Sequence, residues 1–203
     1  MLGDYVAAEK IVVSKLLGAG GERDVYLHPF LDDRVIKISR DNPIDRNKVD
    51  HTYLSALGEF PLIPKMYGWV ETQHGPGLMF ERIRDANGHT SINLGRALRE
   101  GCISPAQARS LMKVTLQELG WKGIVLHDDE NVDNFLLQRK ASSPQLILVD
   151  GFGPFVMTTK ARLRMRFPWL AREKALRCSY NLLSELDKQI QALRASAMIP
   201  AGA

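Results

Sequence analysis

Cysteine is nearly absent from this sequence, and so are the features of exported or membrane-spanning chains. Its 203 residues include only two cysteines, Cys102 and Cys178, too few for a framework of disulfide bonds. The N-terminal stretch lacks the basic start and the apolar run of a secretory signal. No apolar segment approaches the roughly 18 to 20 residues that cross a bilayer. We therefore expect no transmembrane segment and a location in a reducing cytoplasm.

Low-complexity tracts and internal repeats are also missing. Hydrophobic residues make up 45% of the chain and charged residues 25%, which is typical of a folded globular protein. Hydrophobic cores usually split into separate domains only beyond roughly 250 residues. We therefore expect a single domain over residues 1–203.

The first third of the chain predicts short strands separated by turns. A helix is expected to begin at Asp41-Asn42-Pro43, which offers a cap followed by proline, and to end at Gly58. The expected strands cover residues 10–17, 24–27, 34–39, 66–71 and 78–83. These elements predict a sheet of five strands accompanied by one helix.

From about residue 84 the pattern favours helices. Ser104 begins a capped helix, residues 134–137 and 146–149 predict a hairpin, and the chain is helical again up to about residue 193. One apolar stripe in this last helix recurs at steps of three or four residues, so we expect it to face the core. The stripe consists of Leu176, Tyr180, Leu183, Leu186, Ile190 and Leu193.

The most informative segment runs from His127 to Asn134. It places Asp129 and Asn134 at the spacing of the kinase catalytic loop H-x-D-x-x-x-x-N. Phosphoryl transfer needs one carboxylate that orients the attacking hydroxyl and accepts its proton, and an amide oxygen on a magnesium ion beside it. We predict that Asp129 is the catalytic carboxylate and that Asn134 binds metal.

A second acid ends an apolar strand at Asp150 and is followed by Gly151-Phe152-Gly153. A carboxylate in this position can bind magnesium, which prefers hard oxygen ligands. The segment differs from the kinase sequence D-F-G by its extra glycine. We predict that Asp150 and Asn134 are the two protein ligands of Mg²⁺.

A glycine-rich turn lies between two of the expected strands near the N-terminus. Gly18, Gly20 and Val25 fit the pattern G-x-G-x-x-x-x-V of a loop that covers phosphates, and Arg23 stands where protein kinases have a third glycine. A plain hairpin is the commoner explanation of such a turn on its own. In the company of the other motifs we predict that these four residues bind the nucleotide.

A single lysine, Lys37, interrupts the β-branched run Val35–Ile38 and resembles the lysine of the V-A-I-K strand. Such a lysine needs a nearby acid to hold its ammonium group. Asp50, in the following helix, is the predicted partner, and Asp45 is a second candidate. Lys37 and Asp50 therefore join Asp129 as predicted catalytic residues, and Lys37 is also predicted to bind the phosphates of the nucleotide.

These motifs occur in the order that they have in protein kinases, on elements of the required type. We therefore expect an α+β, protein-kinase-like fold, with a small N lobe (about 1–83) and a reduced, mainly helical C lobe (about 84–203). The N lobe has the antiparallel five-stranded sheet and its helix. The expected function is ATP- and Mg²⁺-dependent transfer of a phosphoryl group to a hydroxyl acceptor.

The sequence also resembles the PhoP-regulatory-network (YrbL-type) family of small bacterial kinase-like proteins over most of its length. The resemblance is carried by the glycine loop with Arg23, by Lys37, by Tyr67-Gly68-Trp69, and by Asp85-Ala86-Asn87-Gly88. In that family, arginine at the third loop position is familiar. By the kinase analogy, Glu81 to Ile83 would be the hinge that meets adenine.

A basic stretch makes an anionic acceptor a natural expectation. It contains Lys160, Arg162, Arg164, Arg166, Arg172, Lys174 and Arg177, against the single acid Glu173. A phosphorylated glycan, a lipid head group or a protein would suit it, as would peripheral attachment to the inner membrane. Nucleic acid is not expected, because aromatic residues are sparse there. A solvated helical face that keeps the protein soluble is the plainer reading.

Two other functions stay open at this stage. One is a nucleotide-binding pseudokinase that acts as a regulatory interaction module, which the missing A-P-E segment and the short stretch of about 50 residues after Asp150 favour. The other is an adaptor for membrane or nucleic acid that uses the basic stretch.

Overall fold

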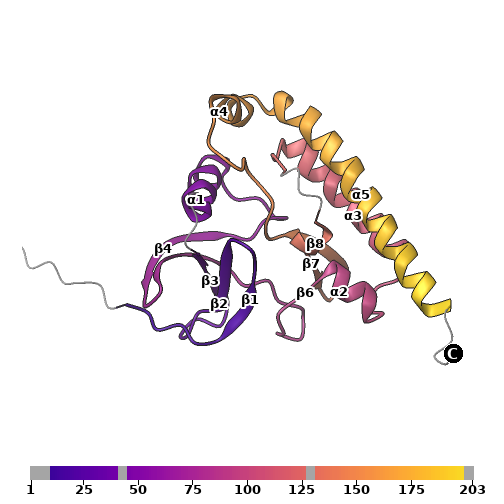
Figure 1. The fold of residues 1–203 in the computed structure, drawn as a ribbon, viewed down its shortest axis with the longest axis horizontal. Helices are drawn as coiled ribbons and strands as arrows, with labels where there is room; N and C mark the ends of the chain where they lie inside the picture. Colours follow the sequence, from indigo (N-terminus) through magenta and orange to yellow (C-terminus); the bar gives the residue numbers. More distant parts are fainter. Residues whose placement is uncertain (1–9, 41–44, 127–130, 199–203) are drawn as a thin grey trace, which may run out of the picture. The chain divides into compact units, whose positions relative to one another are not determined.

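The computed structural model describes residues 10–40, 45–126 and 131–198, and Figure 1 shows their elements in chain order. The chain divides into two compact units. Unit 1 is formed by residues 1–52 and 65–82, and unit 2 by residues 53–64 and 83–203.

Unit 1 is built on a five-stranded antiparallel sheet, as predicted. The strand order is β1-β2-β3-β5-β4, and every neighbouring pair is antiparallel. The strands are β1 (Leu16–Ala19), β2 (Arg23–Leu27), β3 (Arg34–Ser39), β4 (Met66–Thr72) and β5 (Gly75–Glu81). The strand predicted over residues 10–17 starts late, because its first part pairs only through an isolated bridge between Ile11 and Thr72.

One face of this sheet carries an apolar core. Ile36 and Ile38 of β3 are buried there with Val13, and Tyr26 and Val70 pack against them. Gly77 of β5 lets the strands approach, because a methyl group at this position would lie 2.4 Å from Cγ2 of Ile36. Since side chains alternate along a strand, Lys37 lies on the opposite face.

Helix α1 (Arg46–Leu57) follows β3. The carboxylate of Asp45 accepts hydrogen bonds from the backbone of Asn47 and Lys48, so Asp45 caps the helix. The helix ends at Gly58, which has a φ of 75° and donates to the carbonyl of Leu54. The predicted end is confirmed, whereas the predicted start at residues 41–43 lies outside the described residues. The first turns of α1 belong to unit 1 and its last turns to unit 2.

Unit 2 combines helices with a small antiparallel sheet of order β6-β7-β8. The predicted hairpin is confirmed as β7 (Phe135–Arg139) and β8 (Pro144–Leu148), and the two-residue strand β6 (Ile92–Asn93) was not predicted. The helices are α2 (Leu94–Arg99), α3 (Pro105–Lys122), the short 3₁₀ helix η1 (Val132–Asn134), α4 (Thr159–Arg166) and α5 (Pro168–Met198). The α+β class is therefore confirmed, while the likeness to the kinase fold stays a prediction.

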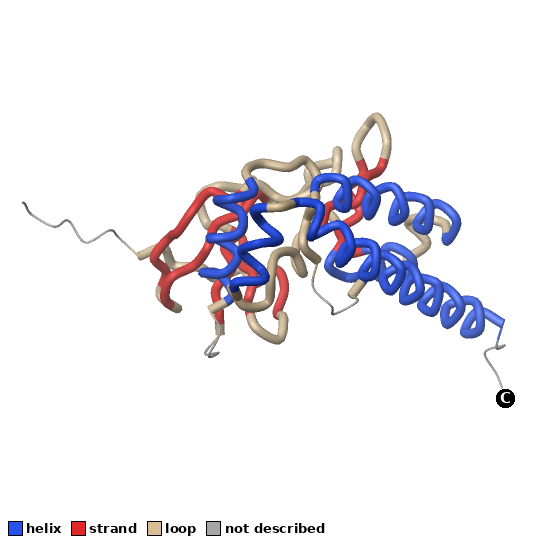
Figure 2. Tube along the Cα trace, turned by 90° about the horizontal axis from the view of Figure 1, so that it is seen from above, coloured by secondary structure: helices blue, strands red, loops and turns tan. Residues whose placement is uncertain are grey.

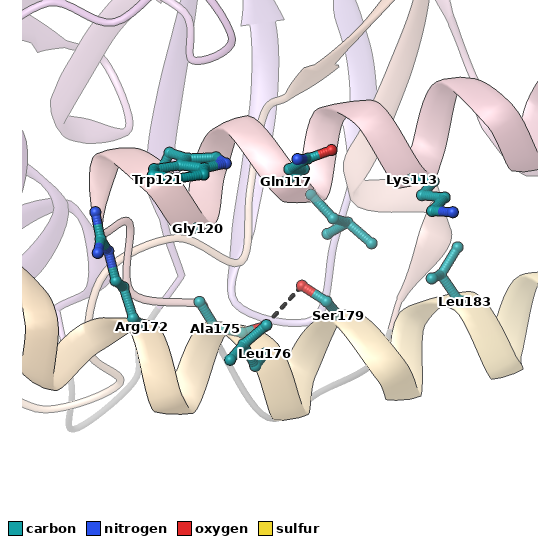
Figure 3. A pocket seen from close by; sticks show the side chains of 10 residues that line it. Lys113, Gln117, Gly120, Trp121, Arg172, Ala175, Leu176, Ser179 and Leu183 are labelled. Carbon is teal, nitrogen blue, oxygen red and sulfur yellow. Dashed lines mark hydrogen bonds between the residues drawn. The ribbon is translucent and has the colours of Figure 1, made fainter.

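Helices α3 and α5 run side by side in unit 2 (Figures 1 and 2). Helix α3 begins at the predicted cap, Ser104, which forms a capping box with Gln107. It ends at Gly123, whose backbone is in the left-handed conformation. Figure 3 shows Gly120 of α3 facing Ala175 of α5. A methyl group on Gly120 would lie 3.9 Å from Cβ of Ala175, an ordinary van der Waals contact between the two helices.

The prediction that the apolar stripe of α5 faces the core is wrong for the first half of the stripe. Leu176 and Tyr180 are exposed, whereas Leu186 and Ile190 are buried. The buried face of the helix begins instead with small residues, which allow α3 to pack closely. It consists of Ala171, Ala175, Cys178, Leu182, Leu186 and Ile190.

Among the helices in the described residues, none is both long enough and apolar enough to cross a bilayer.

Candidate functional site

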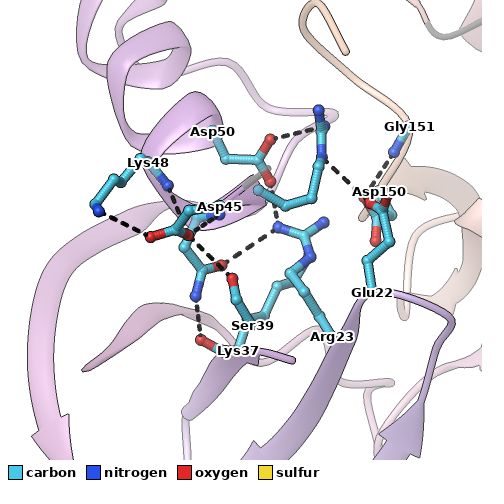
Figure 4. A network of polar contacts seen from close by, with 11 residues as sticks. Glu22, Arg23, Lys37, Ser39, Asp45, Lys48, Asp50, Asp150 and Gly151 are labelled. Atoms are coloured by element: carbon cyan, nitrogen blue, oxygen red, sulfur yellow. Dashed lines mark hydrogen bonds and ion pairs between the residues drawn. The ribbon is translucent and has the colours of Figure 1, made fainter. Parts of the chain in front are cut away.

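In unit 1, the predicted nucleotide residues of β2 and β3 share one face of the sheet. The antiparallel register pairs Val25 with Lys37 and Arg23 with Ser39. These side chains lie on the face opposite the apolar core, toward α1, and Figure 4 shows this face. The sequence motifs on two different strands are therefore brought together in space.

Lys37 is buried, with only 6% of its surface exposed. Its ammonium nitrogen lies 4.8 Å from the centre of the Phe80 ring, close enough for a cation–π contact. Its backbone carbonyl accepts a hydrogen bond of 2.8 Å from the side chain of Asn47, which ties β3 to α1. The lysine is thus held inside unit 1 rather than displayed on an outer edge.

The predicted ion pair between Lys37 and Asp50 is replaced by a different one. Oδ2 of Asp50 lies 2.5 Å from Arg23, and Oδ1 lies 3.2 Å from Arg46 (Figure 4). Both oxygens of this carboxylate are therefore engaged by guanidinium groups. Each arginine contacts a different oxygen, so the buried carboxylate is held by two cations rather than one.

The second candidate, Asp45, does not hold Lys37 either. Its Oδ1 accepts hydrogen bonds from the Ser39 hydroxyl and from the first backbone amides of α1. Its Oδ2 lies 3.4 Å from the ammonium group of Lys48. Asp45 is engaged in capping the helix and joining it to β3.

Arg46 and Glu22 complete this cluster and were not singled out from the sequence. Arg46 is 1% exposed and pairs with Glu22, which follows the glycine turn, at 3.6 Å. Buried charges are stable only when they are paired, and both arginines pair with acids here. The spacing of Arg46 and Asp50, four residues apart on one helix, was the available sequence signal.

The glycine turn itself closes tightly between β1 and β2. Gly18 lies within β1 and pairs with Val25, while the Gly20 N–H donates to the carbonyl of Arg23 at 2.8 Å. The buried guanidinium of Arg23 points to Asp50 and Asn47. This turn is therefore anchored to α1 by the residue that replaces the third glycine.

The predicted hinge residues fall on either side of the division between the units. Glu81 ends β5 in unit 1, and its backbone N–H donates to the carbonyl of Lys65. Ile83 belongs to unit 2, where it is buried and its carbonyl accepts from Ser91 at 3.0 Å. Their contact with adenine stays a prediction.

In unit 2, the predicted metal ligands Asn134 and Asp150 come from the same end of the β7–β8 hairpin. The Val149 N–H donates to the carbonyl of Asn134 at 2.9 Å, directly before Asp150. A methyl group at Gly151 would lie 2.6 Å from Nδ2 of Asn134, so the amide rests against this backbone. Gly151 has a φ of 75° and donates its N–H to Oδ1 of Asp150 at 2.8 Å. The structure therefore places the Asn134 amide against the residue that follows Asp150.

The turn that precedes Asn134 is fixed by its own hydrogen bonds. Asn131 caps η1 by accepting from the Asp133 N–H at 2.9 Å, and Val132 is fully buried. Asp133 in turn accepts from the Gly95 N–H of α2 at 3.2 Å. A side chain at Gly95 would displace Asp133, because a methyl group there would lie 2.3 Å from its Oδ1.

His127 and Asp129 lie outside the described residues, but the segment before them is anchored. The Val125 N–H donates to the Tyr53 hydroxyl at 3.0 Å, and the Gly153 N–H donates to the Val125 carbonyl at 2.8 Å. Leu126 and Phe152 form a β-bridge. The chain that leads to Asp129 is thereby tied to the Asp150–Gly153 segment.

Tyr53, a residue of α1 that packs in unit 2, supports both of these segments. Burial raises the pKa of its hydroxyl to about 12, against the opposing effect of the hydrogen bond from Val125. The ring also packs against Gly153, where a methyl group would lie 3.1 Å from it. No sequence motif indicated this role for Tyr53.

The donor set of this hairpin end suits one kind of metal. Among the residues that the structure describes, no three His, Cys, Asp or Glu side chains cluster as a metal cage. Asn134 and Asp150 instead offer amide and carboxylate oxygens. Two protein oxygens, completed by phosphates and water, are typical of magnesium sites that serve nucleotides.

Comparison with known proteins identifies the family of this chain. A family model described as "PhoP regulatory network protein YrbL" matches residues 10–187. The chain is 35% identical over 107 residues to the uncharacterized protein YrbL of Escherichia coli (strain K12), and equally to that of Shigella flexneri. These matches cover 48% of this chain and 50% of each relative, about half the length of these curated proteins. The family match over most of the sequence confirms the resemblance seen in its motifs, and the chain belongs to the YrbL family of PhoP regulatory network proteins.

Proposed function

We propose that this protein is an ATP- and Mg²⁺-dependent phosphotransferase that acts on a hydroxyl acceptor. The observation that carries the proposal is the end of the β7–β8 hairpin, where Asn134 and Asp150 lie together against Gly151. The sequence places the loop of Asp129 next to this pair. An amide and a carboxylate at this spacing from a catalytic acid are the arrangement that phosphoryl transfer uses.

The metal ligands in this proposal are Asn134 and Asp150. The carbonyl oxygen of the Asn134 side chain and the carboxylate of Asp150 would hold Mg²⁺, which supplies charge neutralisation at the phosphates when bound. The positive φ of Gly151 and its hydrogen bond to Asp150 fix the direction of the carboxylate. A rigid pair of ligands reduces the entropy lost on binding.

Unit 1 would hold the nucleotide. Lys37 would contact the phosphates, with Gly18, Gly20 and Val25 forming the loop that covers them. Since the guanidinium of Arg23 is engaged by Asp50, its part would be to hold the shape of this loop. Glu81 and Ile83 would meet the adenine.

Asp129 would orient the acceptor hydroxyl and take its proton. The hydrogen bond from the Val125 N–H to the Tyr53 hydroxyl, and the one from the Gly153 N–H to the Val125 carbonyl, would position the chain that leads to it. The basic stretch around α4 favours an acceptor that carries negative charge, such as a phosphorylated glycan, a lipid head group or a protein.

One observation favours a second candidate, a nucleotide-binding pseudokinase that acts as a regulatory interaction module. Asp50 is paired with Arg23 and Arg46 and not with Lys37, whereas active kinases need the lysine–acid pair in place. A protein of this kind would bind ATP without turning it over.

The test separates binding from turnover. Thermal shifts with ATP, with and without Mg²⁺, report a formed site, because a ligand that binds only the folded state stabilises it. ATP hydrolysis and acceptor phosphorylation are then compared between wild type and Asp129→Ala. Loss of turnover in the variant with binding retained supports the phosphotransferase. Binding without turnover in either protein favours the pseudokinase, and no Mg²⁺-dependent binding contradicts both.

A matched control keeps the result specific. Asp187 on α5 is an exposed acid that pairs with Arg109, and Asp187→Asn removes one carboxylate outside the proposed site. This variant is expected to keep wild-type binding and turnover. A loss of turnover equal to that of Asp129→Ala would show that the effect is not local.

A further inference from the structure

The positive charge of this chain is concentrated in α4 and the first half of α5. Residues 159–184 contain seven lysines and arginines and one acid, Glu173, a formal charge of +6. Since the whole chain carries +4, the remaining residues carry −2. The basic character of the protein therefore comes entirely from this stretch of unit 2.

The same stretch carries an exposed apolar stripe. Trp169, Leu176 and Tyr180 are seven and four residues apart, so they share one face of α5. They are 66%, 73% and 75% exposed, respectively. This face is different from the buried one that packs on α3, so α5 has two separate apolar faces.

Helix α3 adds a second tryptophan to this stripe. Trp121 is 67% exposed, and the guanidinium of Arg172 lies 5.2 Å from the centre of its ring. The side chains of α3 and α5 line a groove of about 480 Å³ between the helices, with Leu176 at its edge (Figure 3). Lys113 and Arg172 place positive charge along the same groove.

We propose that this basic-aromatic surface, formed by Trp121, Trp169, Arg172, Leu176 and Tyr180 with the cations of α4, docks on an anionic lipid bilayer. Tryptophan and tyrosine are the residues that settle at the level of lipid head groups, and lysine and arginine are attracted to acidic lipids. Surfaces that lie on a membrane combine these two features.

The observations favour a bilayer over the other anionic partners. A nucleic acid would gain from the cations and the aromatic rings but nothing from the exposed aliphatic Leu176. An acidic protein helix would use the groove, yet Trp169 and Tyr180 are exposed and do not line it. A bilayer interface accommodates side chains that project separately from one face.

Such attachment would be peripheral and reversible. The apolar side chains enter the head-group region only in part, and the electrostatic share is screened by salt. The proposal does not rest on the proposed phosphotransferase, because it concerns α3, α4 and α5 and none of the proposed ligands of ATP or Mg²⁺.

The first test is flotation of the purified full chain with vesicles. One set contains phosphatidylcholine alone, and the other contains phosphatidylcholine mixed with phosphatidylglycerol. The protein is expected to float with the acidic vesicles at low salt and to be released as salt is raised. Absence from the acidic vesicles, or equal binding to both sets, would overturn the proposal.

The charge requirement is tested by removing three cations from the surface. Each basic residue near an acidic bilayer contributes about fivefold to binding, so removal of three should weaken binding by on the order of 100-fold. The surface variant is Arg162→Gln/Arg166→Gln/Arg172→Gln. The control removes equal charge from exposed positions elsewhere and is Lys15→Gln/Lys48→Gln/Arg96→Gln. Equal loss in both variants would contradict a specific surface.

The apolar requirement is tested by truncating one exposed side chain. Leu176→Ala should weaken vesicle binding by about tenfold, because its methyl groups no longer enter the interface. Phe30→Ala removes an exposed aromatic ring of unit 1 and should leave binding unchanged. Unchanged binding of Leu176→Ala at low salt would leave only a diffuse electrostatic contact and would contradict the docking surface.

Tryptophan fluorescence locates the contact directly. The chain has three tryptophans, of which Trp121 and Trp169 lie on the proposed surface and Trp69 lies in unit 1. Brominated acidic lipids should strongly quench the fluorescence of Trp69→Phe, which keeps Trp121 and Trp169. They should only weakly quench that of Trp121→Phe/Trp169→Phe, which keeps Trp69. The reverse pattern would overturn the proposal. Binding to RNA or to polyglutamate but not to vesicles would assign the surface to another class of partner and would also overturn it.

Discussion

Replacing Tyr53 with phenylalanine removes a single oxygen atom from the interior of unit 2. The hydroxyl of Tyr53 accepts the Val125 N–H at 3.0 Å, and both residues are buried. The ring stays in place against Gly153, so the substitution deletes the hydrogen bond without opening a cavity. We expect the variant to fold and to be less stable than the wild type.

The loss of stability at neutral pH follows from the Val125 N–H, which is left without an acceptor. A buried N–H group that loses its acceptor costs about 1 to 3 kcal/mol, because it gains no hydrogen bond from water. The free energy of unfolding of Tyr53→Phe should therefore be lower by about this amount at pH 7.

The difference in the free energy of unfolding between wild type and Tyr53→Phe should shrink as the pH is raised. Burial raises the pKa of Tyr53 to about 12 from its usual value of 10.0, so the folded state keeps its proton where the unfolded state loses it. The stabilisation is complete below the pKa of the unfolded tyrosine and is lost as pH rises through the folded pKa. The loss reaches about 1.4 kcal/mol by pH 11 and about 3 kcal/mol well above pH 12.

Urea unfolding of both proteins at about pH 8, 10 and 11 measures this trend. Because all other groups are shared, their titration cancels in the difference. Tyr180→Phe, at an exposed tyrosine, is the control and should differ little from wild type at any pH. A gap between wild type and Tyr53→Phe that stays constant up to pH 11 would refute the reasoning.

Three further predictions concern other parts of unit 2. Gly151→Ala should destabilise the hairpin end by more than about 1 kcal/mol and weaken Mg²⁺-dependent ATP binding, as seen by thermal shift, because φ is positive and Asn134 is in the way. Burial acts to raise the pKa of Asp85, but hydrogen bonds from Arg139 and Ser91 outweigh it and lower this pKa. Wild type should therefore lose more stability than Asp85→Asn as pH falls below about 4 in acid titrations. Ser104→Ala should cost about 1 kcal/mol in urea unfolding, since it removes the capping box of α3.

The hairpin end was predictable because it depends on local rules. Two short apolar runs separated by a polar turn specify antiparallel partners, and the register then places Asn134 beside the residue before Asp150. The five strands of unit 1 were predictable for the same reason. Their β-branched runs and turn residues act over a few positions.

The ion pair of Asp50 was not predictable, because it depends on which of several cations is nearest in space. Lys37, Arg23 and Arg46 all lie within reach of the helix by sequence order. The two arginines pair with the carboxylate, each through a different oxygen, and Lys37 does not. The kinase analogy had favoured the lysine.

The orientation of α5 shows a different limit. The helix carries two apolar stripes, and the larger side chains of Leu176 and Tyr180 made the exposed one look like the core. The buried stripe starts with the small residues Ala171 and Ala175, and Ala175 faces Gly120 of α3. Hydrophobicity alone does not tell which stripe meets a neighbouring helix.

The most direct test of the account is calorimetric titration of ATP into wild type and Asp150→Asn, each with Mg²⁺ and with a chelator. Wild type should bind ATP about tenfold or more tightly when Mg²⁺ is present. Asp150→Asn should lose this gain and keep the affinity measured with the chelator. A variant that keeps the full gain from Mg²⁺ would contradict the claim that Asn134 and Asp150 form a magnesium site.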